Sequence, residues 1–480
     1  MDSQTPHLAV VGGGIAGLAT AYAASRRGAR VTLLECQPRI GGNIRTELID
    51  GFLIDAGPDA FVRTKPDATQ LCEELGLTAD LISTQSRNVY VAHQGKLELM
   101  PAGMALAVPT RLGPMLQTPL LSWRGKMRTL ADLFIRGRES DEDEALGHFI
   151  ARRFGKEAAE RLAAPLLGGI YAGDVEELSI KATFPQLLAL ERSHGSLIMG
   201  LFAAQQRREG GLDSSRSRLG ALTAVFRWLR RAPHEAPSPF YSLRGGMQQL
   251  TDAIVAALPA GSIRTGVEVT GLRPPTDDAA RWGVDLAGGE GLEVDRVALC
   301  VPAYIAARWI PDSHARDILC QIPYVSTATV FLGFRREQLA HSLDGVGFIV
   351  PKGEGSLMAA TWVSSKWEHR APEGHVLLRG FIGGRRNEHQ LEQSSDEDLI
   401  RLTLEELRRY MGRIETPILT RVYRYTKANP QPLVGHEGKL EAMRQHLATL
   451  PGLTLAGAAY GGVGIPDCIR QGRMIAENLV

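Results

Sequence analysis

The sequence predicts an α/β and α+β fold with more than one structural unit, and three observations point to it. The chain has 480 residues, which is too long for a single hydrophobic core. A strand–helix–strand unit of about thirty residues stands at its beginning. A short strand, a glycine-rich loop and a helix come near residue 460, after long helical and long strand-like stretches. We therefore expect a Rossmann-like domain, a mixed-sheet domain and a helical unit.

Composition places the chain among ordinary globular proteins. Hydrophobic residues make up 44% and charged residues 22%, and 54 basic against 53 acidic residues leave a net charge of +1. Nucleic acid is not expected as a partner, because it needs a strong basic excess. The five cysteines form no C-x-x-C pair, which argues against a disulfide framework or a zinc site and indicates a reducing, cytoplasmic compartment. They are Cys36, Cys72, Cys300, Cys320 and Cys468.

Two apolar runs, Leu99 to Thr110 and Leu112 to Trp123, are separated only by Arg111. Prolines interrupt both runs, so they cannot form one membrane-spanning helix. They are compatible with a peripheral membrane contact or with the lining of a large apolar pocket. Buried loops and short helices of a second domain explain them equally well.

The first element is a strand over Leu8 to Val11, and it ends in the fingerprint Gly12-x-Gly14-x-x-Gly17. Gly12 permits a tight turn, Gly14 lets a pyrophosphate approach the backbone, and Gly17 lets the following helix pack closely on the strand. The phosphates of a dinucleotide would then lie at the helix N-terminus.

A second strand, Arg30 to Leu34, leads to Glu35, an acid at the position where it can accept hydrogen bonds from a ribose. It would repel a 2′-phosphate, which argues against NADP. The glycine pair Gly41-Gly42 after Arg39 and the loop Asp55-Ala56-Gly57-Pro58 offer two more close approaches of the backbone. Together with the cluster Gly461 to Gly464 they favour a long cofactor, FAD, over NAD.

The middle of the chain alternates between helical and strand patterns. From Leu112 to Arg230 it is mostly helical, with a flexible joint at Arg207 to Arg218. Further predicted elements are a helix from Gly245 to Leu258, strands over Gly266 to Leu272, Trp282 to Leu286 and Leu292 to Val301, strand alternation from Ser326 to Phe381, a charged helix from Asp396 to Met411, a strand over Leu453 to Gly457, and a final helix from Asp467.

Three stretches resemble one family. The fingerprint with its acid and glycine-rich ending resembles the amine oxidase and phytoene desaturase superfamily. Gly169-Ile170-Tyr171-Ala172-Gly173-Asp174 and Ala458 to Arg470 resemble signatures of the oxygen-dependent protoporphyrinogen oxidases, and the resemblance covers essentially the whole chain.

The resemblance implies a six-electron oxidation of a porphyrinogen to a porphyrin by non-covalent FAD, with dioxygen reoxidising the flavin and releasing hydrogen peroxide. It implies protoporphyrinogen IX as the first substrate and coproporphyrinogen III as the alternative. It implies an FAD-binding domain of residues 1–65, 240–302 and 416–480. A substrate domain of 66–92, 202–239 and 303–415 and a helical, membrane-associated unit of 93–201 complete the expected organisation. A homodimer is compatible with these expectations.

The resemblance also assigns site residues. Glu35 would bind the adenosine ribose, the Val269 backbone would contact the adenine end, and Val463 to Ile465 would lie at the flavin. The Gly169 carbonyl would lie near the tetrapyrrole, and Leu332 would pack on a substrate ring. The expected cofactor-binding residues are Gly12, Gly14, Ile15, Ala16, Gly17, Glu35, Arg39, Gly41, Gly42, Gly57, Pro58, Asp59, Val269, Val463, Gly464 and Ile465.

Two positions depart from the family pattern. Asn88 stands where many relatives carry an arginine that pairs with a substrate propionate, and Arg87 precedes it by one residue. A one-residue shift on a strand turns a side chain to the opposite face, so Arg87 replaces that arginine or is an ordinary surface residue. Val346 stands where relatives carry a phenylalanine, which leaves less aromatic contact and predicts weak binding of diphenyl-ether inhibitors.

Three other classes remain as alternatives. A flavin amine oxidase would share the fingerprint but leaves the stretch around Tyr171 unexplained. A carotenoid desaturase would use the same cofactor on an apolar polyene. The alternative that is not an enzyme is a flavin-binding assembly protein without turnover.

Overall fold

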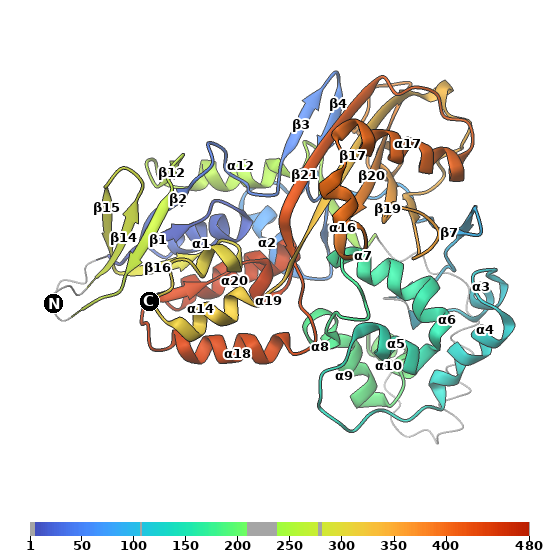
Figure 1. Ribbon diagram of the computed structural model, residues 1–480, viewed down its shortest axis with the longest axis horizontal. Helices are drawn as coiled ribbons and strands as arrows, with labels where there is room; N and C mark the ends of the chain where they lie inside the picture. The colour runs from blue at the N-terminus through green and yellow to red at the C-terminus, as the bar shows by residue number, and fades with distance from the viewer. Residues whose placement is uncertain (1–4, 106–107, 209–237, 277–280, 480) are drawn as a thin grey trace.

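The computed structural model describes residues 5–105, 108–208, 238–276 and 281–479. These residues form three units; in the two sheet-based units segments far apart in the chain meet, whereas the helical unit is built mainly from one continuous stretch (Figure 1). A parallel sheet with its helices lies on the left of the view, a larger mixed sheet at the upper right, and a group of helices at the lower right. The predicted α/β and α+β architecture is confirmed.

The first unit is built on a five-stranded parallel sheet with the order β12-β2-β1-β16-β22. Its central strand is buried on both faces, as parallel strands are. Leu8 and Val10 pack against α1, α2, α12 and α20, whereas Ala9 and Val11 pack on the side of α13, α14 and α18. The strands are β1 (His7–Val11), β2 (Arg30–Glu35), β12 (Ile263–Thr265), β16 (Arg296–Leu299) and β22 (Leu453–Leu455); the helices are α1 (Ile15–Arg26), α2 (Pro66–Glu74), α12 (Gln248–Ala257), α13 (Ala303–Ala306), α14 (Ser313–Cys320), α18 (His436–Leu447), α19 (Ala458–Gly461) and α20 (Ile465–Glu477).

The single strand predicted over Leu292 to Val301 is wrong, because two strands occupy it. β15 (Gly291–Val294) closes an antiparallel meander with β13 (Val269–Arg273) and β14 (Trp282–Leu286), while β16 belongs to the parallel sheet. Asp295 separates them, and it exchanges hydrogen bonds with His7 at the start of β1. These hydrogen bonds hold Asp295 beside the start of β1, at the point where the chain leaves the meander and enters the parallel sheet.

The second unit is a seven-stranded sheet with the order β21-β17-β20-β19-β18-β7-β8. Its last strand along the chain, β21, was expected in the FAD-binding domain but pairs with β17 along its whole length. The strands are β7 (Val89–His93), β8 (Lys96–Leu99), β17 (Tyr324–Arg335), β18 (Gly347–Ile349), β19 (Ala359–Trp362), β20 (His375–Gly383) and β21 (Leu419–Pro430); the helices are α15 (Val363–Lys366), α16 (Gly384–Gln393) and α17 (Asp396–Met411).

Smaller strands join these units. β3 (Thr46–Ile49) and β4 (Phe52–Asp55) form a hairpin, and β11 (Phe240–Leu243) lies between β5 (Phe61–Val62) and β6 (Leu81–Ser83).

The third unit is helical and buries much of the two apolar runs. Val108, Met115 and Leu120 are fully or almost fully buried in its core, which supports the packing interpretation of these runs. Leu197 and Ile198 of α10 pack in the same core, so α10 belongs to this unit. Its elements are β9 (Met104–Ala105), β10 (Val108–Pro109), α3 (Leu112–Gln117), α4 (Trp123–Leu130), α5 (Leu146–Phe154), α6 (Lys156–Ala158), a π-helix (Ala159–Gly168), α7 (Gly169–Tyr171), α8 (Ile180–Thr183), α9 (Pro185–His194) and α10 (Leu197–Arg208).

The predicted joint at Arg207 to Arg218 falls almost wholly outside the described residues. None of the helices in the described part of the chain has the length and apolar character that a membrane span requires.

Candidate functional site

The three fingerprint glycines have different surroundings. Gly12 has a φ of +106°, and a Cβ there would lie 2.5 Å from the carbonyl oxygen of Cys300. A Cβ on Gly17 would lie 1.9 Å from the carbonyl oxygen of Gly12, so α1 touches the loop at this point. A Cβ on Gly14 would meet nothing within 4 Å. The open space at Gly14 is the place where a pyrophosphate can approach the backbone.

The N-terminus of α1 has the properties of an anion site. Gly14 is its N-cap and offers no side chain to cap the helix, and the first turn, which includes Ile15, Ala16 and Gly17, contains no acid. The first N–H groups of a helix lack partners within it and carry the positive end of its dipole. These residues therefore fit the phosphates of a dinucleotide.

Glu35 lies at the end of β2 beside the fingerprint loop. It is nearly buried, and its carboxylate accepts hydrogen bonds from the N–H groups of Gly13 at 2.6 Å and Gln37 at 2.8 Å. The remaining lone pairs of its oxygens can accept ribose hydroxyls. Val267 donates its N–H to the backbone oxygen of Glu35, which places the start of β13 and the predicted adenine contact Val269 close to this acid.

The second glycine pair lies directly against the fingerprint. The N–H of Gly41 donates to the carbonyl oxygen of Gly13 at 2.8 Å. A Cβ on Gly42 would lie 3.0 Å from the Cα atom of Gly14. The Arg39 guanidinium holds this turn by donating to the carbonyl oxygens of Ile40, Gly42 and Ile44. The structure thus brings the two predicted glycine motifs together.

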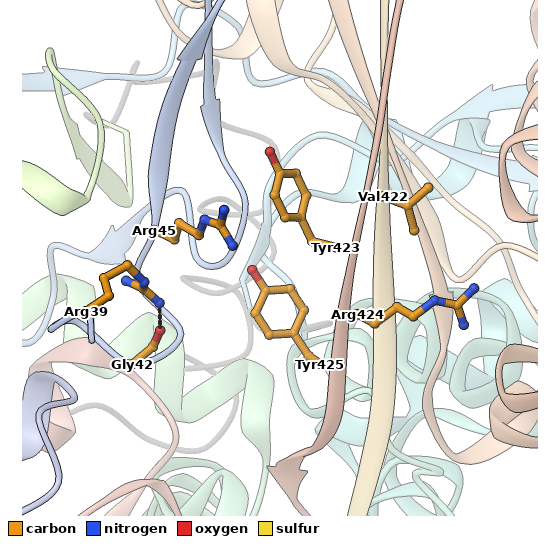
Figure 2. A pocket seen from close by; sticks show the side chains of 7 residues that line it. All are labelled: Arg39, Gly42, Arg45, Val422, Tyr423, Arg424 and Tyr425. Atoms are coloured by element: carbon orange, nitrogen blue, oxygen red, sulfur yellow. Dashed lines mark hydrogen bonds between the residues drawn. The ribbon is translucent and has the colours of Figure 1, made fainter. Parts of the chain in front are cut away.

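A pocket of about 320 Å³ opens beside Gly42. Figure 2 shows the Tyr423 and Tyr425 rings of β21 facing Arg39 and Arg45 across it. Burial and the nearby charge of Arg45 lower the pKa of the Arg39 guanidinium. The pocket is therefore an arginine- and tyrosine-lined space next to the phosphate loop, in which Arg45 already pairs with Glu47.

The loop of Gly57, Pro58 and Asp59 joins the parallel-sheet unit to the seven-stranded sheet. A Cβ on Gly57 would lie 1.9 Å from the carbonyl oxygen of Asn43. The buried Arg379 of β20 donates to the Gly57 carbonyl oxygen at 2.8 Å. The Asp59 carboxylate accepts from the Lys366 ammonium and the Trp367 indole, both at 2.8 Å.

The electrostatics of Asp59 show that its side chain is already engaged. Burial would raise its pKa, but the charges of Lys366 and Arg379 and the two hydrogen bonds hold the pKa well below its ordinary value. The carboxylate is therefore ionised at neutral pH, and a cofactor contact at this residue would have to use the backbone.

The glycine-rich stretch of Gly462 to Gly464 leads into α20, whose N-cap is Gly464. Asp467 in its first turn is nearly buried and binds the Lys65 ammonium at 2.6 Å. The carboxylate offsets the positive end of the α20 dipole, so this terminus suits a neutral, carbonyl-bearing group better than a phosphate. Val463 packs against the helical unit, and the predicted flavin residues Val463, Gly464 and Ile465 therefore lie where two units meet.

The thiols near this stretch are unreactive. Burial raises the pKa of Cys468 to about 12 and that of Cys300 to about 12. Both are protonated at neutral pH, so neither offers a thiolate for covalent attachment.

The predicted substrate residues lie in separate places. Gly169 in α7 is exposed, and a Cβ there would meet nothing within 4 Å, while its carbonyl oxygen accepts the N–H of Ala172 at 3.3 Å. Val346 donates its N–H to the carbonyl oxygen of Asn88 at 2.8 Å, which brings these two positions together. The Asn88 amide donates to the carbonyl oxygen of Asp344 at 3.0 Å, and Arg87 is exposed beside it.

Leu332 requires a correction. It is fully buried in the core between β17 and α17, so its side chain cannot pack on a ligand ring. Thr329 and Phe331 occupy the other face of β17: Thr329 donates to the carbonyl oxygen of Ala56, and Phe331 packs with Phe52 and Ile54. Successive strand residues face opposite sides, and at these residues of β17 both faces are buried against protein.

Sequence reasoning missed Arg45, Tyr423, Tyr425 and Gln431. The alternation of Val422, Tyr423, Arg424 and Tyr425 was a signal, because it places both tyrosines on one face of a strand. Gln431 is buried and donates to the Tyr171 carbonyl oxygen at 2.8 Å, while its own Oε1 has no partner among the described residues. No sequence motif around Gln431 indicated this contact.

A family model described as flavin containing amine oxidoreductase matches residues 15–480. The chain belongs to this family. The match confirms that it is an oxidoreductase and a flavoprotein, with FAD as the predicted cofactor.

Relatives match along the whole chain. It is 34% identical to coproporphyrinogen III oxidase of Bacillus subtilis, covering 100% of this chain and 98% of that protein. It is 36% identical to coproporphyrinogen III oxidase of Propionibacterium freudenreichii, covering 100% and 92%. It is 25% identical to protoporphyrinogen oxidase 2 of Arabidopsis thaliana, covering 98% and 93%.

Solved structures show the same fold. The crystal structure of an Exiguobacterium protein proposed to be a protoporphyrinogen oxidase superposes with a TM-score of 0.83 at 32% identity, covering 99% of both chains. Putrescine oxidase superposes with a TM-score of 0.69 at 16% identity, covering 99% and 98%, which shows the fold alone.

Proposed function

We propose that this chain oxidises a porphyrinogen to the porphyrin with FAD as the electron acceptor and dioxygen as the final oxidant, releasing hydrogen peroxide. The observation that carries the proposal is the end-to-end match to porphyrinogen oxidases at 34% and 36% identity, in a chain whose phosphate loop is open at Gly14. Each double bond formed removes two electrons and two protons, and one dioxygen accepts them.

The residues of this chain would bind and orient the reactants. Glu35 would hold the ribose, and the N–H groups at the start of α1, with Arg39 beside them, would hold the phosphates. Bound FAD supplies the hydride acceptor. The protein would add a dry, shaped space between the parallel sheet and the seven-stranded sheet, with the exposed Gly169 at its edge. An aromatic product makes a strong protein base unnecessary.

Between the two porphyrinogens we favour coproporphyrinogen III, which carries propionates where protoporphyrinogen IX carries vinyl groups. The relatives with the two highest identities quoted above act on coproporphyrinogen III. Protoporphyrinogen IX remains the second candidate, since relatives of both kinds span this chain.

An aerobic fluorescence assay with each porphyrinogen offered separately to the flavin-loaded protein tests the proposal. We expect porphyrin emission to rise faster than in the air-oxidation blank, together with hydrogen peroxide, and faster with coproporphyrinogen III. Equal or greater kcat/KM with protoporphyrinogen IX would overturn the substrate preference alone. Rates equal to the blank with both, and turnover of an amine such as putrescine, would overturn the reaction.

We also propose that the helical unit contacts a membrane surface. Trp123 and Met127 stand one turn apart on α4 and are 66% and 50% exposed, and Phe134 is 70% exposed. Arg124 is exposed beside them and can meet anionic headgroups. The unaltered protein should sediment with anionic vesicles, whereas the Trp123→Ser variant should stay in the supernatant. Sedimentation of both proteins with the vesicles, or of neither, would contradict this contact. Size-exclusion chromatography of the vesicle-free protein tests the expected homodimer.

A further inference from the structure

Three potential metal ligands meet on the parallel-sheet unit, outside the flavin site. Asp312 is the N-cap of α14, His314 lies in the first turn of that helix, and His446 lies in the last turn of α18. The two helices run side by side along one face of the unit (Figure 1). The cluster is thus assembled from two elements that are far apart in the sequence.

The ligand atoms are close enough to share one ion. One donor atom from each residue lies within 4.8 Å of those of the other two. The Nδ1 atom of His446 lies 3.5 Å from Oδ1 of Asp312, and the His314 and His446 rings stack with centroids 5.0 Å apart at an angle of 5°. Ligand atoms about 2.1 Å from a tetrahedral ion lie about 3.4 Å from one another, so a small rotation of the exposed His314 side chain would complete the geometry.

The backbone around Asp312 leaves its carboxylate partly free. Its Oδ1 accepts the N–H of Ala315 at 2.7 Å, which fixes the carboxylate at the start of α14. In the described part of the chain no hydrogen bond is made to its Oδ2, and the side chain is 23% exposed, so an ion can reach it from solvent. The carboxylate, which a backbone N–H holds in place, and the two imidazoles together offer three donor atoms to a metal ion.

We propose that Asp312, His314 and His446 bind a divalent transition-metal ion of the zinc class. Two imidazole nitrogens and one carboxylate oxygen suit Zn²⁺, and three protein ligands leave a fourth position for water. Hard ions such as Mg²⁺ prefer oxygen ligands in octahedral geometry and are not expected here.

The bound ion would fasten α14 to α18. At the other end of α18, His436 makes a hydrogen bond to the carbonyl oxygen of Ala459, which precedes the glycine-rich stretch before α20. Binding to the folded state alone raises stability in proportion to the logarithm of metal concentration. The ion would therefore stabilise the folded protein by linking α14 to α18.

Calorimetric titration of chelator-treated, flavin-loaded protein with ZnCl₂ tests the site. We expect one equivalent to bind the unaltered protein, and Zn²⁺ to raise its melting temperature. His314→Ala and Asp312→Asn should each weaken binding at least tenfold and abolish the rise, and asparagine keeps the N-cap of α14. Co²⁺ in place of Zn²⁺ should give the visible absorption of a four-coordinate ion.

The matched control is His148→Ala, since His148 is an exposed histidine of the helical unit. It should leave the affinity for Zn²⁺ and the thermal shift unchanged. The proposal fails if the His314 and Asp312 variants bind Zn²⁺ as the unaltered protein does, or if His148→Ala weakens binding equally. It also fails if the unaltered protein binds no Zn²⁺, which would leave the cluster as a helix cap beside two stacked imidazoles.

Discussion

At the scale of single residues, Gly14 and Gly17 of one fingerprint have opposite surroundings. A side chain at Gly14 would extend into open space, whereas one at Gly17 would collide with the backbone of Gly12. Gly17 therefore serves the packing of helix on loop, and the open space at Gly14 is where we expect the ligand.

Gly14→Val should separate cofactor binding from folding. Gly14 has a φ of −74° in the extended region, which valine adopts readily, so the fold should persist. Its side chain would fill the space for the pyrophosphate and weaken FAD binding by at least tenfold, about 1.4 kcal/mol. Flavin titration of the apoprotein measures this. Gly17→Ala should instead lower the melting temperature of the apoprotein; FAD affinity unchanged in Gly14→Val would contradict the assignment.

Asp59→Asn should cost stability through its ion pair with Lys366. The loss should be about 2–3 kcal/mol at neutral pH, because the ammonium is left nearly buried without its partner. The folded-state pKa of Asp59 is depressed, so its carboxylate stabilises the fold above the unfolded value of about 3.9. That contribution disappears as the pH falls below about 4. Urea unfolding of both proteins should show a constant gap from pH 5 to pH 8 that narrows below pH 4; a gap that widens on acidification would contradict it.

Motif spacing predicted which backbone segments lie together at the phosphate loop. Glu35 and Gly41 contact Gly13, and Gly42 lies against Gly14, while their roles toward a cofactor stay predictions. Leu332 failed because both faces of β17 pack against protein at this point, which the alternation of the sequence does not show. Arg45 and Tyr423 become pocket residues only because β21 crosses beside the β3–β4 hairpin, which no local pattern shows.

At the scale of elements, α1 packs on α20 (Figure 1), and both helices begin at glycine-rich stretches that are predicted to bind the cofactor. A Cβ on Gly472 would lie 2.6 Å from the backbone nitrogen of Thr20, so the helices touch backbone to backbone there. The two helices can come this close because Gly472 carries a hydrogen atom where other residues carry a side chain.

Gly472→Ala should push α1 and α20 apart. We expect a loss of about 1–3 kcal/mol in the free energy of unfolding, together with weaker FAD binding. Gly438→Ala is the control, because Gly438 lies in α18 with nothing within 4 Å of a Cβ and should gain about 0.5–1 kcal/mol from helix propensity. Chemical unfolding and flavin titration measure both; equal behaviour of the two variants would contradict the role of this contact.

Predictions of elements followed hydrophobic period and capping. Asp396–Met411 is a helix with the predicted bounds, and Ser395 and Asp398 form its capping box. Trp282–Leu286 is likewise a strand as predicted. Leu292 to Val301 was read as one strand, because its apolar run continues through a point where the chain changes sheets at Asp295. Periodicity does not report such a change.

At the scale of the molecule, the predicted cofactor would join segments from both halves of the chain. Removal of FAD should therefore lower the melting temperature. At FAD concentrations about 100 times Kd, the stabilisation should be about 2.7 kcal/mol and should grow with added FAD. Differential scanning fluorimetry of apoprotein with increasing FAD measures it, with riboflavin, which lacks the phosphates, as control. Equal effects of the two would contradict binding through the phosphate loop.

The strand order β12-β2-β1-β16-β22 also has a consequence for synthesis on the ribosome. β1 and β2 emerge early, yet β16 follows only after the helical unit, and β22 only after the seven-stranded sheet has been made. Nascent chains thus carry an unfinished sheet with an exposed edge for most of translation, and such edges invite aggregation. The stretch Val463 to Ile465 comes later still. Because this stretch is predicted to lie at the flavin, we expect lasting retention of flavin to be among the last events in the maturation of this protein.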